Sequence, residues 1–167
     1  MMITTKFKEL MSLNGEMNAA EIESRFTQIA KLLFENFAIQ KGEKIYLFKE
    51  IEFYFYNKHH RDIITHPRFS DSLYWYMNDF GGIDLNFPSE ICKKDGIDST
   101  GKKVDKYILD DSSYFGGILI RQLVSEDKSD ILEGPWACAE LFRLHHALEQ
   151  DNNFPFLVAV SYTHLRA

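Results

Sequence analysis

Two carboxylates and several phenols alternate along one stretch of the sequence, and these residue types can move protons and hold a planar molecule. Residues 44–57 alternate strictly enough to be typical of a β-strand. One face carries the apolar side chains Ile45, Leu47, Ile51, Phe53 and Phe55. The other face carries Tyr46, Phe48, Glu50, Glu52, Tyr54 and Tyr56. The first set predicts a core face, and the second predicts a polar and aromatic surface.

Glu52 and Tyr54 are the pair on this surface with the clearest chemical use. Residues two apart on a strand project to the same side. A carboxylate among aromatic rings is partly desolvated, which suits it to take a proton from water, and a phenol ring can stack on a planar substrate. The alternative is an edge strand with solvated glutamates, because structural charges outnumber catalytic ones.

A histidine-bearing connection follows this strand. His59, His60, Asp62 and His66 are residue types that bind metals, but metal binding needs ligands that converge. Neighbouring histidines on an extended chain diverge, and the spacing matches no defined metal motif. A solvated loop is therefore favoured, and a metal-dependent hydrolase is the alternative.

Two further features are open to two interpretations each. Tyr74 and Tyr76 share one face of a predicted strand, which indicates either a core contact or a platform on which a base stacks. Arg121 lies within an apolar strand, where a guanidinium needs a partner. That partner is either a carboxylate such as Glu50 or a phosphate or carbonyl group of a substrate.

The order of predicted elements indicates an α+β fold. The first half of the chain predicts a short helix over 3–12, a helix over 19–37 opened by Asn18 and Glu21, and strands over 44–57, 73–77 and 82–87. A surface hairpin or loop over 89–112, a strand over 114–124 and a charged loop over 125–133 follow. The last elements are a strand over 154–159 and, before it, a helix over 134–148, which is expected to bury Trp136, Leu141, Leu144 and Leu148. Strands joined by short turns favour a largely antiparallel sheet with flanking helices. Residues 1–159 are expected to form one domain.

Composition limits the classes of protein that the chain can belong to. The net charge of -6 argues against a generic basic nucleic-acid binder, although Lys58, Arg61 and Arg68 form a local basic cluster. The two cysteines have no metal-ligand spacing and predict free thiols in a reducing compartment. No apolar segment resembles a signal peptide or a membrane span, so we expect a cytoplasmic monomer. Residues 160–167 resemble a translated sequencing-adapter read-through, which predicts that the natural C-terminus is missing.

Four short motifs occur in an order that carries more information than each motif alone. They are Ile51-Glu52-Phe53-Tyr54, Asp62-Ile-Ile-Thr-His66, Leu73-Tyr74-Trp75-Tyr76 and Gly117-Ile-Leu-Ile-Arg121. This order resembles the alkyladenine, or 3-methyladenine, DNA glycosylase family over about residues 44–124. The resemblance implies an enzyme that removes alkylated purines from damaged double-stranded DNA without a metal or another cofactor.

The resemblance also implies roles for individual residues. Glu52 would activate water, and Tyr54, His66, Tyr76 and Asn86 would hold the flipped base. Arg121 would contact the nucleotide backbone, and we expect the cluster Lys58, Arg61 and Arg68 to contribute to DNA binding. The chain lacks the glycine- and proline-containing turn of the family, and residues 77–80 offer no clear equivalent of the aromatic wedge that fills the gap left by the base: Asn78 and Asp79 are poor wedges, and Phe80 is the one aromatic side chain there. The alternative is a non-enzymatic relative that binds a small planar ligand or a protein partner in the same aromatic cleft.

Overall fold

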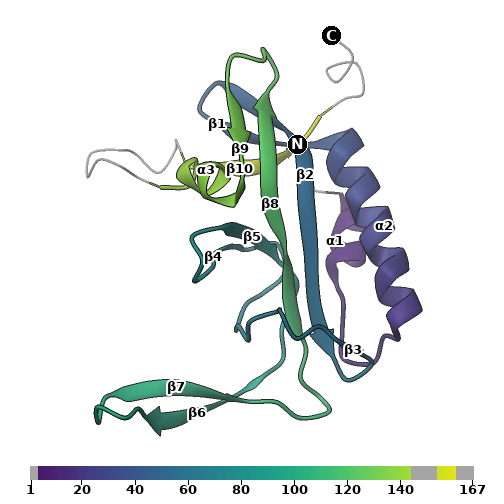
Figure 1. The fold of residues 1–167 in the computed structure, drawn as a ribbon. Coiled ribbons are helices and arrows are strands. Elements are labelled where there is room, and N and C mark those ends of the chain that lie inside the picture. Colours follow the sequence, from purple (N-terminus) through teal and green to yellow (C-terminus); the bar gives the residue numbers. More distant parts are fainter. Residues whose placement is uncertain (1–3, 144–153, 161–167) are drawn as a thin grey trace.

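Strand β2 (Lys44–Asn57) is the longest strand, and the other elements are arranged around it (Figure 1). The computed structural model describes residues 4–143 and 154–160. The main sheet has the order β10-β1-β2-β8-β5-β4, and neighbouring strands are antiparallel. Its other strands are β1 (Phe37–Lys41), β3 (His60–Arg61), β4 (Trp75–Met77), β5 (Ile83–Asn86), β8 (Phe115–Ser125), β9 (Ile131–Glu133) and β10 (Phe156–Ala159). The predicted α+β fold with a largely antiparallel sheet is confirmed.

Two helices precede the sheet, and both agree with the sequence pattern. They are α1 (Thr5–Met11) and α2 (Ala19–Asn36). The backbone N–H of Glu21 donates to the side chain of Asn18 at 3.0 Å, and the backbone N–H of Asn18 donates to the Glu21 carboxylate at 2.8 Å. This reciprocal pair satisfies two N–H groups that a helix start leaves without partners. No helix among the described residues is long and apolar enough to cross a membrane.

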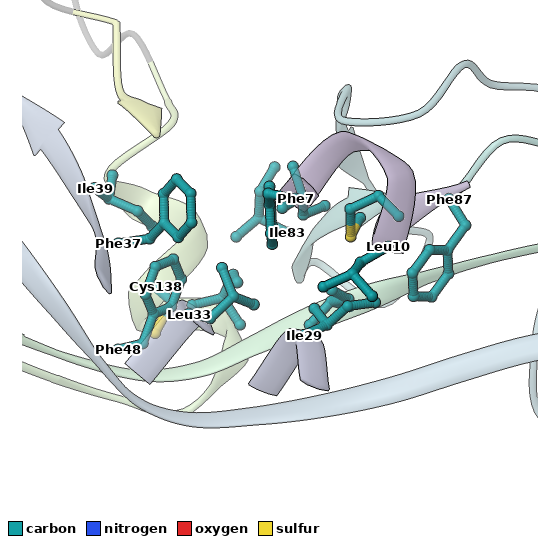
Figure 2. Close-up of a cluster of buried hydrophobic side chains, with 14 of the residues drawn as sticks. Phe7, Leu10, Ile29, Leu33, Phe37, Ile39, Phe48, Ile83, Phe87 and Cys138 are labelled. Atoms are coloured by element: carbon teal, nitrogen blue, oxygen red, sulfur yellow. The ribbon is translucent and has the colours of Figure 1, made fainter. Parts of the chain in front are cut away.

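An apolar core cluster lies where α1 and α2 cover one side of the sheet (Figures 1 and 2). Phe26 of α2 stacks on Phe53 of β2 with ring centroids 4.5 Å apart. Phe55 meets Phe87 edge to face at 5.8 Å. Offset and edge-to-face contacts of this kind are the arrangements that aromatic rings prefer. The helices therefore occupy one side of β2, and the residues that alternate with Phe53 and Phe55 face the other side.

The predicted face pattern of β2 is wrong near the start of the strand, because the pairing of β2 with β8 is locally irregular. Tyr46 and Phe48 are each only 3% exposed, although they were assigned to the polar face. The pairing of β2 with β8 shifts between Phe48 and Ile51, and Arg121 has no Cα partner in the register. Each strand has one extra residue here. As a result, the buried side chains of β2 have even residue numbers before the irregularity (Tyr46, Phe48) and odd numbers after it (Phe55). A bulge also changes the direction of nearby side chains, and this one lies beside the predicted site.

The remaining elements lie at the edges of the sheet. Strands β6 (Cys92–Ile97) and β7 (Lys103–Ile108) form a separate antiparallel hairpin, as predicted for residues 89–112 (Figure 1).

Helix α3 (Pro135–Glu140) begins with the predicted proline but is shorter than expected. Trp136 is 59% exposed, so its predicted burial is wrong. Its ring lies under the Arg143 guanidinium at 4.3 Å, while the predicted core residues Leu144 and Leu148 lie outside the described residues.

Candidate active site

The side of the sheet that faces away from α2 brings most of the predicted site residues together. Directly paired residues of antiparallel strands share a side. Between β2 and β8, Glu52 is paired with Leu119 and Tyr54 with Gly117. Between β8 and β5, Leu119 is paired with Asp84 and Gly117 with Asn86. Between β5 and β4, Asp84 is paired with Tyr76. Residues from β2, β8, β5 and β4 that are far apart in the sequence therefore form one continuous surface.

A cavity of about 230 Å³ opens on this surface. Its lining residues are Tyr54, Ile64, Thr65, His66, Arg68, Asn78, Phe80, Gly82, Asp84, Leu119 and Pro135. The rings of His66 and Phe80 lie 5.1 Å apart on one side of it. An apolar and aromatic wall combined with a few polar groups is the usual composition of a small-molecule site.

Glu52 is held by Arg121 at this surface. Nη1 of Arg121 donates to Oε2 of Glu52 at 2.7 Å, and its Nε donates to Oε1 of Glu50 at 2.9 Å. The ion-pair interpretation of Arg121 is therefore confirmed. The side chain of Glu52 is 41% exposed, so its carboxylate is partly desolvated, as expected, and it is paired with a guanidinium. Arg121 therefore binds one oxygen of the Glu52 carboxylate.

Tyr54 connects this carboxylate to the cavity. Burial, together with a hydrogen bond to Glu52, raises the pKa of the Tyr54 hydroxyl above its usual value. The phenol therefore stays protonated at neutral pH and donates to the carboxylate. Because Tyr54 also lines the cavity, Glu52 lies one hydrogen bond away from the cavity wall.

A buried polar cluster forms another part of the cavity wall. Nη1 of Arg68 donates to Oδ2 of Asp84 at 2.5 Å and to Oδ1 of Asn86 at 3.1 Å. Nδ2 of Asn78 donates to Oδ1 of Asp84 at 3.1 Å. The guanidinium of Arg68 lies 4.4 Å from the ring centre of Tyr76. Asn86 and Tyr76 therefore contact Arg68, whereas neither of them lines the cavity itself.

The sequence prediction missed Asp84 and Asn78. Asp84 is 2% exposed and lies between the buried residues Ile83 and Leu85 of β5. A charged residue inside a short apolar strand is the same signal that singled out Arg121, and it would have identified Asp84. Asn78 had no such signal, because its role depends on the turn between β4 and β5, where its side chain accepts from the N–H groups of Phe80 and Gly82.

The expected basic surface cluster is not present as predicted. Arg68 is 4% exposed and paired with Asp84, so it is wrong as a surface contact to DNA. Nζ of Lys58 pairs with Glu16 at 2.9 Å. Arg61 is exposed on β3. Arg68 therefore belongs to a buried network, whereas Lys58 and Arg61 lie at the surface. The three residues are separated because the chain turns inward after His66, a residue that lines the cavity.

The structure does not bring the four metal-binding residue types of the histidine-bearing connection together in the described part of the chain. Within residues 4–143 and 154–160, no group of three His, Cys, Asp or Glu side chains is close enough to hold a metal ion. Nδ1 of His60 instead forms a hydrogen bond of 2.6 Å with the carbonyl oxygen of Phe55. The side chain of Asp62 accepts from the backbone N–H of Ile64 at 3.0 Å. These contacts stabilise the connection and leave the four residues apart.

Comparison of the chain with protein-family models, curated proteins and solved structures found no match. The site offers a cavity of about 230 Å³, one carboxylate that is connected to its wall through Tyr54, and a buried cluster of polar groups.

Proposed function

We propose that the chain is a DNA glycosylase that takes an alkylated purine into the cavity and hydrolyses its N-glycosidic bond. The observation that carries this proposal is the contact between Glu52 and Tyr54, which puts a water-activating group beside an aromatic cavity. The cavity of about 230 Å³ is smaller than the roughly 300–1,000 Å³ of sites for drug-sized ligands. That size suits a single base that has left the DNA stack.

The proposed binding step uses the aromatic wall. An enzyme that acts on a base inside a duplex must first extrude it, and the extruded base then stacks between aromatic or apolar side chains. Tyr54, His66 and Phe80 supply rings around the cavity, and Leu119 supplies an apolar contact. Stacking on an aromatic side chain is worth about 1–3 kcal/mol for each base, which offsets part of the cost of unstacking.

The proposed chemical step uses Glu52 as a general base. The Glu52 carboxylate takes a proton from water while the water oxygen bonds to the anomeric carbon of the sugar. The bond from that carbon to the purine nitrogen breaks, and its electron pair leaves with the base. Many alkylated purines are already cationic, so they depart with little help from an acid. Arg121 and Tyr54 fix the orientation of the carboxylate, which is the contribution that positioned groups make to catalysis.

Phe80 is the proposed wedge that replaces the extruded base. It lies in the turn between β4 and β5, and its side chain is 76% exposed. The turn is held by Asn78, whose side-chain oxygen accepts from the N–H groups of Phe80 and Gly82 at 3.0 and 2.9 Å. A large apolar side chain on a braced turn beside the cavity is suited to enter a gap in stacked bases.

Base release from methylated duplex DNA tests this proposal. Wild type is expected to release 3-methyladenine, and Glu52→Gln is expected to lower the rate at least 100-fold, because general bases typically contribute about 10²–10⁴-fold. Glu50→Gln is the matched control, since Glu50 binds the same arginine but is 57% exposed and makes no contact with the cavity wall. Equal rates for wild type and Glu52→Gln would remove Glu52 from the mechanism.

A second candidate is a protein that binds a planar ligand in the same cavity without hydrolysis. It is favoured by the pairing of Glu52 with Arg121, since one carboxylate oxygen is already engaged. This candidate predicts that a free base raises the melting temperature while no base is released from DNA. The same preparations used in the release assay distinguish the two candidates.

A further inference from the structure

The most exposed apolar side chains of the described residues gather around the cavity. In this part of the chain, the four highest exposures among large apolar residues are 93% for Ile63, 76% for Phe80, 72% for Phe69 and 67% for Ile64. Ile64 and Phe80 line the cavity. Ile63 and Phe69 are each the direct neighbour of a lining residue. Single exposed apolar side chains are normal on a protein surface, but a group of them marks an interaction surface.

Ile63 lies in a turn that is braced against the end of β2. Strand β3 (His60–Arg61) leads into this turn and pairs with the last residues of β2. The backbone N–H of Asp62 donates to the carbonyl oxygen of His60 at 3.0 Å. The N–H of Ile64 donates to the Asp62 carboxylate, also at 3.0 Å. The backbone on both sides of Ile63 is therefore fixed, while its side chain projects into solvent.

The exposure of Ile63 describes the shape of this surface. A side chain that is 93% exposed packs against almost nothing, not even its apolar neighbours. Protein partners bind closely packed patches, whose side chains partly cover one another. Ile63 instead projects alone, as Phe80 does from the braced turn between β4 and β5. An isolated apolar side chain on a fixed backbone is suited to enter a narrow gap.

From this geometry we infer that Ile63 is a second wedge, which enters the base stack of a damaged duplex next to the base that the cavity takes. This inference rests on the proposed function and names how the site holds its DNA partner. Proteins that kink DNA insert Phe, Leu, Ile or Met side chains between base steps and partly unstack them. Arg61, two residues before Ile63, is exposed, which suits a phosphate contact beside the opened step.

Insertion supplies binding free energy that the charges of the chain do not supply. The net charge is -6, so the whole molecule does not attract the negatively charged DNA backbone. Moving an apolar side chain from water to a position between bases is favourable in proportion to the area that leaves water. Because Ile63 is almost completely exposed in the free protein, nearly all of its apolar surface is available for this gain.

Ile63→Ala tests the inference, because truncating a side chain that is 93% exposed removes almost no packing from the fold. The probe is a short duplex that carries an abasic-site analogue next to 2-aminopurine, a base whose fluorescence rises when it unstacks. Wild type is expected to bind this duplex and to raise the fluorescence. Ile63→Ala is expected to raise it little and to bind about tenfold more weakly, since burial of an isoleucine side chain contributes a factor of that size or more.

Ile131→Ala is the matched control. Ile131 is 58% exposed on β9 and does not line the cavity, so the same truncation is expected to keep the wild-type affinity and fluorescence. Equal affinity and fluorescence for wild type and Ile63→Ala would overturn the inference, as would the same loss in both variants. Binding by wild type without a rise in fluorescence, or no binding, would overturn it too, and a protein partner would then be sought for this surface.

The duplex holds no alkylated purine, so this experiment does not depend on hydrolysis. Base release from methylated duplex DNA is measured separately on the same preparations. A loss of unstacking in Ile63→Ala, together with no base release by wild type, would support the second wedge and overturn the proposed hydrolysis. Base release by wild type, with unstacking unchanged in Ile63→Ala, would support the hydrolysis and overturn the second wedge.

Discussion

Glu50 and Glu52 lie two residues apart on β2 and bind the same arginine, but they differ in their contact with the cavity wall. Both carboxylates bind Arg121, at 2.9 and 2.7 Å. Of these two carboxylates, only Glu52 also contacts Tyr54, and Tyr54 connects it to the cavity wall. The sequence predicted that Glu52 and Tyr54 share a face, because residues two apart on a strand do so. It could not predict how strongly Glu52 is paired, because Arg121 is distant in the sequence.

The raised pKa of Tyr54 leads to a prediction at high pH. Its usual value is 10.0, and burial and the contact with Glu52 favour the protonated form in the folded state. The contribution of this phenol to stability is therefore complete below pH 10 and is lost as the pH rises through the higher folded-state pKa. Titration of phenolate absorbance is expected to show that Tyr54→Phe removes a group that ionises late. Loss of a group that ionises near pH 10 would contradict the account.

At the scale of elements, the bulge shared by β2 and β8 shapes the site. The register of the two strands shifts between Phe48 and Ile51, beside Arg121. This shift allows one arginine to reach Glu50 and Glu52, which alternate around Ile51 on β2. The close approach of β8 to β5 is the second requirement, and it depends on Gly117.

Gly117→Ala tests the close approach of the strands. The added methyl group would lie 3.2 Å from Cβ of Asp84 and would crowd Asn86 and Arg68. We expect the free energy of unfolding to fall by about 1–3 kcal/mol, the usual effect of overpacking. Gly96→Ala is the control, because the nearest atoms to its methyl group belong to the flexible side chain of Lys106. Equal stability of the two variants in urea denaturation would contradict this explanation.

The sequence predicted most elements because their signals are local. Helix α2 was predicted from Asn18, Glu21 and its apolar period, and strand β2 was predicted with the observed bounds. The face pattern of β2 was wrong before Phe48, because a bulge depends on the partner strand. Arg68 was assigned to the surface for a similar reason, since its partner Asp84 lies 16 residues away.

For the whole molecule, the distribution of charge limits the expected affinity for DNA. The net charge is -6. Lys58, Arg68 and Arg121 each form an ion pair with a carboxylate. Of the four residues predicted to bind DNA, all of which lie in the described part of the chain, Arg61 alone has no ion pair. These four residues therefore offer few free cations to phosphates, and under the proposed function recognition comes mainly from the extruded base.

This distribution predicts weak DNA binding with a shallow dependence on salt. Each phosphate contact lowers the affinity about fourfold when salt rises from about 50 to 200 mM. With one or two contacts, we expect a loss of less than about 20-fold in fluorescence anisotropy, compared with roughly 10³–10⁵ for proteins that make 6–10 contacts. A steep loss would contradict the charge argument, and no binding at low salt would contradict DNA as the substrate.

The central claim is that Glu52 hydrolyses the bond between an alkylated purine and its sugar, and a product count tests it most directly. Free bases and abasic sites are counted after methylated duplex DNA is incubated with wild type or Glu52→Gln. The account predicts equal numbers of the two products from wild type, more than one for each protein molecule, and at least 100-fold fewer of each from Glu52→Gln in the same time. Neither product from the folded wild-type chain, or the same yield from both proteins, would contradict it.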